Sequence, residues 1–232
     1  MKKSRVKKEI EQIAHIECGF TDKFGIPRQS GKVDTKAEIV FEKEYASADA
    51  VRGLEGYSHL WLLWDFSKAK CDGFSATVRP PRLGGNTRMG VFATRSPYRP
   101  NGIGLSSVRL LSVDIKNGVP VLTVSGADLL DKTPIFDIKP YLAYTDSHPD
   151  AKCGFAEDAL SHLLIADVPE EISKNIPENT VAEIKNIISE DPRPSYIDDE
   201  ERVYGFSYSG YEIKFKVKNN TATVIQIKED LK

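Results

Sequence analysis

The alternation of apolar and polar residues over the first 145 positions predicts a strand-rich body. Apolar side chains alternate with polar ones at 13–18 and 37–41, the pattern of a strand with one buried face. A continuous apolar run at 57–66 has the length of a fully buried strand. Between these segments, a short helix is expected at 47–54, started by Ser47 and stopped near Gly53 or Gly56. Further strands are expected at 89–94, 103–115 and 119–124, with Asn117-Gly118 as the turn of a hairpin.

The pattern changes beyond about residue 150. Thr180 and Glu183 have the spacing of a capping box, which predicts a helix that starts there and runs to about residue 189. Pro192 follows as a helix terminator. A small meander is then expected from strands at 203–207, 211–217 and 221–227, with a tight turn at Asn219-Asn220. The sequence therefore predicts a mainly β protein, in which a small β-barrel body at 1–150 precedes a small α+β appendage at 151–232.

Composition places the chain among globular proteins. It has 232 residues, of which 40% are hydrophobic and 28% charged, enough apolar content for a core. No apolar run approaches the roughly 18 residues of a membrane span. The basic N-terminus is not followed by the apolar stretch of a signal peptide, so a cytoplasmic location is expected. No pair of histidines has metal-ligand spacing, and no metal is expected.

The net charge of −2 conceals two opposed blocks. Residues 73–113 contain six arginines and no Asp, Glu or Lys. Residues 146–201 contain fifteen carboxylates and four Lys or Arg. A guanidinium suits phosphate and can stack on bases, so the first block is a candidate surface for a polyanion. The alternative is that individual arginines bond to carbonyl groups of their own loops.

Two rigid loops lie within this arginine block. Residues 94–105 are rich in Pro, Gly and Arg, as expected of a clamp for an anion or cofactor. Gly102-Ile103-Gly104 resembles the start of a dinucleotide fingerprint, but strand residues follow where that motif needs a helix, which disfavours a Rossmann fold. Residues 79–86 form a second cationic loop, which could equally be an exposed connector.

Several other residues allow two interpretations. His59 lies in an apolar strand, where a lone histidine is more often part of the core than a ligand. Asp128 and Asp131 follow a strand at a turn, and they could cap that turn or hold the ribose hydroxyls or amine of a nucleoside ligand. Arg193 and Tyr196 lie in a stiff turn and would suit phosphate contact and base stacking.

Five motifs stand out in order along the chain: RPPRLGGN from Arg79, RSPYRPNGIGLS from Arg95, DLLD from Asp128 with Thr133-Pro134, DIKPY from Asp137, and DPRPSY from Asp191. Taken together, they resemble those of the TsaA-like family, the tRNA adenine N6-methyltransferases called TrmO, over roughly residues 11–228. The resemblance implies a small barrel that binds S-adenosylmethionine (SAM) outside the Rossmann class. It implies a homodimer with the cofactor near the subunit interface. It also implies methylation of N6 on threonylcarbamoyladenosine at position 37, next to the anticodon of threonine tRNA.

The resemblance also assigns site residues. The family usually has glycine after the second aspartate of DLLD, where this chain has Lys132, which leaves the geometry of that turn open. The implied cofactor contacts are Pro27, Arg28, Gln29, His59, Leu60, Arg95, Leu105, Asp128, Leu129, Leu130 and Asp131.

Methyl transfer from a sulfonium needs mainly the alignment of the N6 nitrogen with the methyl group. An acceptor should help to free the delocalised N6 lone pair, and the candidates are Asp137, Tyr144 and Asp146. The cationic residues are expected to contact the anticodon loop, so that affinity falls with salt. The appendage at 151–232 is expected to serve in substrate recognition. The expected tRNA contacts are Arg79, Arg82, Arg88, Arg99, Arg193 and Tyr196.

A second class of function shares most of these features. The same barrel could hold the cofactor without methyl transfer, as a non-catalytic RNA-binding or adenosyl-ligand-sensing module. Composition does not separate the two possibilities.

Overall fold

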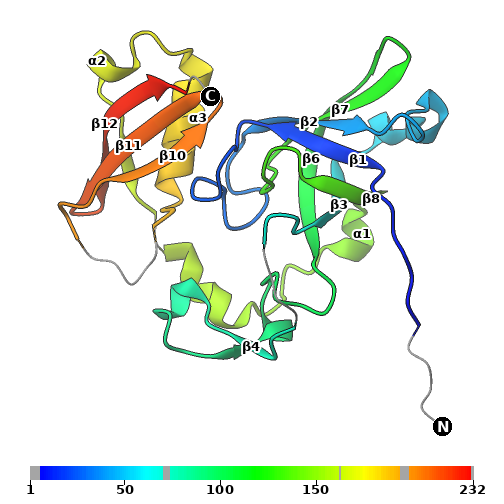
Figure 1. The fold of residues 1–232 in the computed structure, drawn as a ribbon, viewed down its shortest axis with the longest axis horizontal. Coiled ribbons are helices and arrows are strands. Elements are labelled where there is room, and N and C mark those ends of the chain that lie inside the picture. The colour runs from blue at the N-terminus through cyan, green and yellow to red at the C-terminus, as the bar shows by residue number, and fades with distance from the viewer. Residues whose placement is uncertain (1–5, 70–73, 162, 194–198, 231–232) are drawn as a thin grey trace.

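The computed structural model describes residues 6–69, 74–161, 163–193 and 199–230. It shows two β-sheet bodies joined by long loops, with a third, loop-rich lobe beneath them (Figure 1). The predicted fold class is therefore confirmed: a mainly β chain with a barrel followed by a small α+β unit.

The first body is a closed barrel of six antiparallel strands in the order β1-β2-β7-β6-β3-β8. Strand β3 alternates between inward and outward side chains, so Leu60 and Leu62 are fully buried. The hairpin of β6 and β7 turns at Asn117 and Gly118, both with positive φ, as that dipeptide predicts. The strands are β1 (Ala14–Cys18), β2 (Lys36–Phe41), β3 (His59–Asp65), β6 (Ile103–Lys116), β7 (Val119–Ser125) and β8 (Pro134–Pro140).

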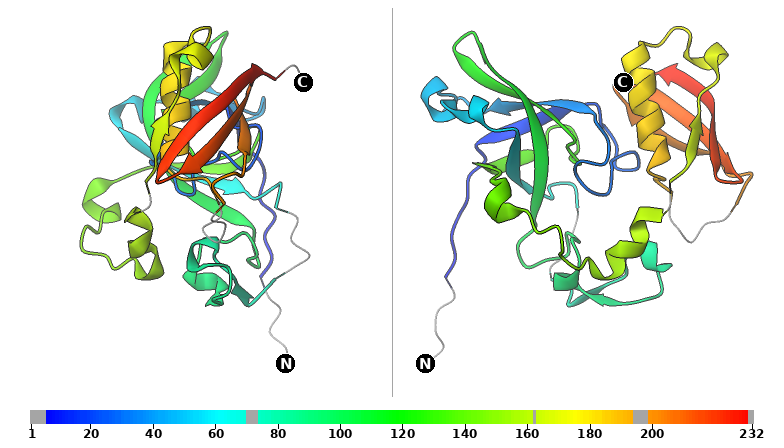
Figure 2. Two further views of the ribbon diagram at one scale, coloured as in Figure 1. Left: turned by 90° about the vertical axis from the view of Figure 1, so that its left-hand side faces the viewer. Right: turned by 180° about the vertical axis from the view of Figure 1, so that it is seen from behind.

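The second body is a four-stranded sheet in the order β10-β11-β12-β9, covered on one face by helix α3 (Figure 2). The isoleucines of α3 at 184, 187 and 188 are buried against the sheet. The elements are β9 (Ile165–Asp167), α2 (Glu170–Ser173), α3 (Glu178–Ser189), β10 (Tyr204–Tyr208), β11 (Tyr211–Lys218) and β12 (Thr221–Glu229).

The loop-rich lobe contains most of the arginine block. In Figure 1 it lies below the barrel, around the label of β4. It holds the two-stranded sheet of β4 (Thr77–Val78) and β5 (Met89–Gly90) and the 3-10 turns η3 (Pro81–Leu83) and η4 (Val91–Ala93). The remaining elements are η1 (Ala48–Val51), η2 (Leu54–Gly56), α1 (Ala143–Asp146) and η5 (Gly154–Ser161).

Three local predictions need correction. The helix expected at 47–54 is a pair of 3-10 turns, although Ser47 caps the first turn as predicted. The strand expected at 89–94 ends at Gly90 because the chain closes into η4, where the Thr94 amide donates to the Val91 carbonyl. The capping box is wrong: α3 starts at Glu178 after Pro177, and Thr180 lies inside the helix with its side chain buried.

The loop at 19–33 connects the two sheet bodies. It leaves the barrel after β1 and reaches toward the C-terminal sheet (Figure 2). Phe20 is 1% exposed within the hydrophobic core of the C-terminal domain, and its ring lies 5.0 Å from that of Tyr208. The Ser209 amide donates to the Gly19 carbonyl at 2.9 Å, and the Ser207 amide donates to the Asp22 carboxylate. The loop therefore ties the barrel to the hydrophobic core of the C-terminal domain, which is separate from the core of the barrel.

In the described part of the chain, none of the helices is long and apolar enough to span a membrane. The same residues contain no group of three or more His, Cys, Asp or Glu side chains arranged to hold a metal ion.

Candidate cofactor and RNA-binding site

A cavity of about 720 Å³ opens where β3 ends and the 19–33 loop passes the barrel. Its walls come from segments far apart in sequence: the 19–33 loop, the end of β3, the loop at 97–98 and the turn at 128–133. Trp64, Phe66 and Tyr98 supply aromatic surface, while Asp65 and Asp128 supply carboxylates. Lys23 and Lys68 also line it, so the walls combine apolar surface with charges of both signs. A cavity of this size is typical of a small-molecule site.

A chain of hydrogen bonds fixes the wall of this cavity. The Trp64 Nε1–H donates to Ser106 Oγ at 2.9 Å, and the Ser106 hydroxyl donates to Asp128 Oδ1 at 2.5 Å. Trp64 also packs against Gly104, where a Cβ atom would overlap its indole. Gly104 therefore makes room for the Trp64 indole and is not part of a dinucleotide-binding motif.

Burial raises the pKa of Asp128, and the hydroxyl of Ser106 and the charge of Arg95 oppose that shift. Arg95 also donates through Nη1 to Gln29 Oε1. The next residue of the 19–33 loop, Ser30, accepts a hydrogen bond from the Ser107 amide at 3.2 Å. Three residues that the sequence assigns to the cofactor, Gln29, Arg95 and Asp128, thus lie together beside the cavity.

Pro27 and Arg28 lie at the junction with the C-terminal domain. Pro27 is buried, and Arg28 Nη2 donates to the carbonyl oxygen of Arg193 at 2.7 Å. Gly25 lies so close to the C-terminal sheet that a Cβ atom on it would be 2.6 Å from the Phe206 ring. The C-terminal domain therefore holds the loop segment that carries the proposed cofactor residues.

The turn at 128–132 divides its side chains between cavity and core. Leu130 lines the cavity, whereas Leu129 is 1% exposed in the barrel core. Asp131 Oδ1 accepts a hydrogen bond from the Cys18 amide at 2.9 Å, and Asp131 also borders a smaller adjoining hollow. Lys132 has a φ of 61°, the left-handed conformation that glycine adopts most readily. The turn therefore keeps a glycine-like backbone despite the lysine.

Three other assigned residues lie apart from this cavity. The Leu60 side chain is fully buried inside the barrel. His59 lies at the opposite end of β3, where it contacts Ser58 and Tyr141. Leu105 is 53% exposed on β6.

None of the three candidate proton acceptors lines the cavity. Asp137 pairs with Leu63, whose side chain points away from that of Trp64, and its carboxylate contacts Lys139 Nζ at 2.8 Å. Tyr144 is 87% exposed on α1. Asp146 accepts hydrogen bonds from the Leu142 amide and the Trp61 indole, both at 2.9 Å, and these bonds lower its pKa. These groups could serve only if the target base approached the outer face of β3 and β8.

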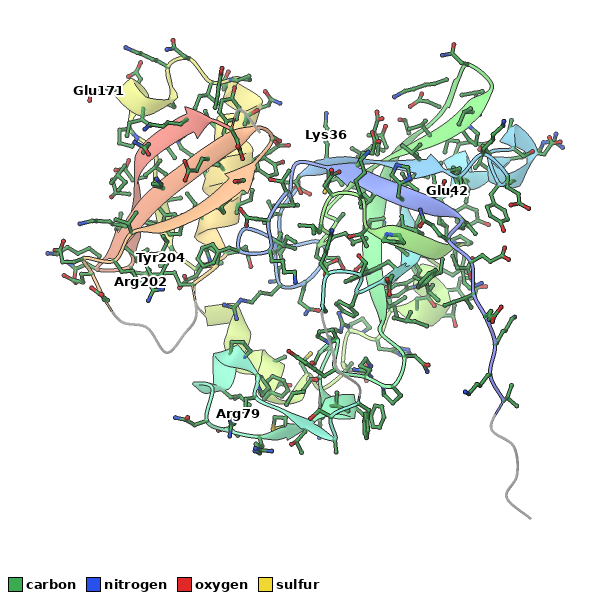
Figure 3. The ribbon with its side chains drawn as sticks, in the orientation of Figure 1. Lys36, Glu42, Arg79, Glu171, Arg202 and Tyr204 are labelled. Carbon is green, nitrogen blue, oxygen red and sulfur yellow. The ribbon has the colours of Figure 1, made fainter. Side chains whose placement is uncertain are left out.

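The arginines assigned to RNA fall into two groups. Arg79 and Arg88 are exposed on the loop-rich lobe, and Figure 3 shows Arg79 at its edge. Arg99 donates to its own loop, to the carbonyls of Thr94 at 2.6 Å and Val91 at 3.3 Å. Arg193 is held by Asp191, with Nε 2.8 Å from Oδ1. The side chain of Arg82 and all of Tyr196 lie outside the described residues.

Sequence reasoning missed the aromatic wall of the cavity. Trp64 and Phe66 end the apolar run that predicts β3, and that run alone does not show which of its side chains border a cavity. Ser106 lies in the motif that begins at Arg95, but no pattern marks it as the partner of Asp128. The two bonds become visible only when β3 and β6 pair with Trp64 opposite Gly104.

Comparison with known proteins shows the family of the chain. The family model described as "tRNA-methyltransferase O N-terminal domain" matches residues 15–147. The model described as "TrmO C-terminal domain" matches residues 163–230. The chain belongs to the tRNA-methyltransferase O family. The resemblance inferred from the sequence motifs is thereby confirmed.

Individual relatives of this TrmO family member extend the comparison. The chain is 40% identical over 219 residues to a tRNA (adenine(37)-N6)-methyltransferase of Escherichia coli K12, covering 90% of this chain and 93% of that protein. It is 36% identical over 151 residues to an Archaeoglobus fulgidus protein named "Probable S-adenosyl-L-methionine-binding protein", covering 65% of this chain and 38% of that protein. A crystal structure of TrmO from Pseudomonas aeruginosa superposes with a TM-score of 0.78 at 30% identity, covering 97% of this chain and 99% of that one.

Proposed function

We propose that this TrmO family member transfers the methyl group of SAM to N6 of threonylcarbamoyladenosine at position 37 of threonine tRNA, and that it acts as a cytoplasmic homodimer. Methylation of adenine 37 at N6 follows from family membership and from the names of full-length relatives. The observation that carries the proposal is the cavity at the end of β3, with Gln29, Arg95 and Asp128 gathered beside it.

The residues of this cavity fit SAM in size and in chemistry. A volume of about 720 Å³ lies within the range of small-ligand sites. Trp64, Phe66 and Tyr98 offer faces for an adenine ring or a sulfonium. Asp128 can accept hydrogen bonds from ribose hydroxyls or an ammonium group, and Arg95 can pair with a carboxylate. When bound, SAM supplies a methyl group that its sulfonium already activates.

The task of the protein is then alignment. The Trp64–Ser106–Asp128 hydrogen bonds hold the cavity wall in one arrangement before any ligand binds. Arg95 links the 19–33 loop to the loop at 94–105, which closes one side of the site. The aromatic side chains also limit the access of water to the methyl group. The proton acceptor stays a proposal, with Asp137, Tyr144 and Asp146 as the candidates from the sequence.

The homodimer is supported by an exposed apolar strip on β6. The side chains of Ile103 and Leu105, two residues apart on β6, both point outward from the barrel and are 38% and 53% exposed. A second subunit packed on this strip would bury both side chains. In such a dimer, Leu105 of one subunit could reach the cofactor of its partner, consistent with its proposed role.

The decisive experiment is transfer of labelled methyl groups. Purified protein incubated with methyl-labelled SAM and threonylcarbamoylated threonine tRNA should place the label on N6 of residue 37, read by nucleoside mass spectrometry. The same tRNA without the threonylcarbamoyl group is the control for substrate choice. Binding of SAM without any label transfer would support the sensor module instead, an alternative that the enzyme names of the relatives do not favour.

As the pH is lowered, SAM binding is expected to weaken at a higher pH than it would if it depended on a carboxylate with an ordinary pKa. Burial raises the pKa of Asp128 above the usual range of an aspartate, and the ionised form is the one that accepts hydrogen bonds from a ligand. Binding should therefore be complete above the raised pKa and be lost as pH falls through it. Calorimetric titration with SAM across pH, with circular dichroism as a check of folding, measures this midpoint. Asp128→Asn should bind weakly at neutral pH and show no such midpoint.

A further inference from the structure

Two phenylalanines stand exposed on the loop-rich lobe. Phe92 is 70% exposed and Phe74 is 55% exposed, although each has a large apolar side chain. Their ring centroids are 6.2 Å apart with an interplanar angle of 25°, so the rings form a stacked pair. Such a pair in contact with water is unfavourable unless a ligand covers it.

The pair is held in place by its own loop. Phe92 lies in η4, where Val91 is 1% exposed and its amide donates to the Ala76 carbonyl at 3.0 Å. The guanidinium of Arg99 lies 5.6 Å from the centre of the Phe92 ring and also donates to the carbonyl oxygens of Val91, which begins η4, and Thr94, which follows it. Phe92 is therefore presented on a backbone held by several hydrogen bonds, which lowers the entropic cost of binding.

The arginines around the pair favour an anionic ligand, and the two aromatic rings favour one with flat rings. The pair lies within the segment 73–113, which has six arginines and no acidic residue. Arg79 and Arg88 are exposed on the same lobe. Arginines that neutralise phosphates, combined with aromatic faces, are the usual means of binding single-stranded nucleic acid. Unpaired bases of an RNA loop can turn outward and stack in this way.

The pair also adjoins the cavity. The Ser75 amide, next to Phe74, donates to the Tyr98 carbonyl at 3.3 Å, and Tyr98 lines the cavity. A nucleotide whose base reaches SAM at the opening of the cavity would thus have its neighbours in the strand close to the two rings.

We propose that Phe74 and Phe92 form a stacking platform for an unpaired nucleobase that flanks the target adenosine in the anticodon loop. This inference rests on the proposed function, because it assumes that an RNA loop delivers its base to the cavity. The arginines hold the phosphates, and the platform fixes the register of the loop so that the correct nucleotide faces the cavity.

The test uses the full-length protein and a fluorescent, threonylcarbamoylated anticodon stem-loop RNA. Phe92→Ala and Phe74→Ala should each weaken RNA binding by about 5- to 100-fold, the range for loss of one stacked base. The dependence of affinity on salt should stay unchanged, because no charge is removed. Arg88→Ala should instead reduce the salt slope by about one unit. Phe92→Trp should retain binding, and Tyr57→Ala, at an aromatic residue 39% exposed near η2, is the matched control.

Two further readouts separate the possible failures. SAM affinity by calorimetry and mass in solution by light scattering should be the same for all variants and wild type. Unchanged RNA affinity in the phenylalanine variants, with wild type binding and methylating normally, would overturn the platform alone. A change of oligomeric state in these variants would overturn it in favour of a contact with a second copy of the chain. Wild type that binds no RNA would overturn the proposed function itself.

Discussion

Arg95→Ala is expected to weaken SAM binding by about 10- to 100-fold while the barrel stays folded. The fold-change corresponds to the roughly 1.5–3 kcal/mol of a hydrogen bond to a charged group. Arg95 is an exposed loop residue, so its removal leaves no cavity in the core. It does leave Gln29 without the guanidinium that holds it and Asp128 without a nearby positive charge. Both losses fall on residues proposed to contact the cofactor.

Calorimetric titration with SAM measures this effect, with thermal unfolding as the check of folding. Arg79→Ala is the matched control, because Arg79 is an exposed arginine of the same block that does not line the cavity. The control variant should bind SAM like wild type. Unchanged SAM affinity in Arg95→Ala would show that its assignment as a cofactor residue is wrong.

Loss of the C-terminal domain is expected to abolish SAM binding as well as recognition of tRNA. Phe20 and Val33 of the 19–33 loop are buried in the core of that domain, at 1% and 2% exposure. Without residues 163–232 both side chains would face water, at about 1.5–3 kcal/mol for each large apolar group. The loop would then lose the position from which Gln29 meets Arg95. A measured loss of SAM binding on this deletion would give the C-terminal domain a part in the cofactor site, beyond its expected part in substrate recognition.

Two matched substitutions test this coupling in the full-length chain. Phe206→Leu alters the ring that packs against Gly25 of the 19–33 loop. Phe215→Leu alters a buried ring of the same sheet that contacts Tyr204 and Phe206. Both should lower the stability of the domain, but only Phe206→Leu should raise the Kd for SAM. Equal SAM affinities in the two variants, or a deletion variant that binds SAM normally, would contradict the coupling.

The sequence indicated the fold because its signals are local. Alternation of apolar and polar residues predicted β1 and β2 close to their observed ranges, and the Asn-Gly and Asn-Asn pairs marked two tight turns correctly. The continuous apolar run predicted β3 as a fully buried strand, whereas only alternate side chains of β3 are buried, because its other face points away from the barrel core. The start of α3 was misplaced because Thr180 offers a capping side chain, whereas the packing of that side chain into the core decided otherwise. Local propensity yields to tertiary packing where the two conflict.

The sequence by itself determined the mainly β fold, the cationic segment and the family, since each depends on residue types in a fixed order. Only the tertiary structure decided which residues meet. Barrel closure brings Trp64, Ser106 and Asp128 into one hydrogen-bonded chain, and the 19–33 loop places Gln29 against Arg95. The same strand pairing leaves His59 and Leu60 at the end of β3 that is far from the cavity. The physical reason is that these contacts join positions up to 66 residues apart, and burial and strand register, which set such contacts, are properties of the whole fold.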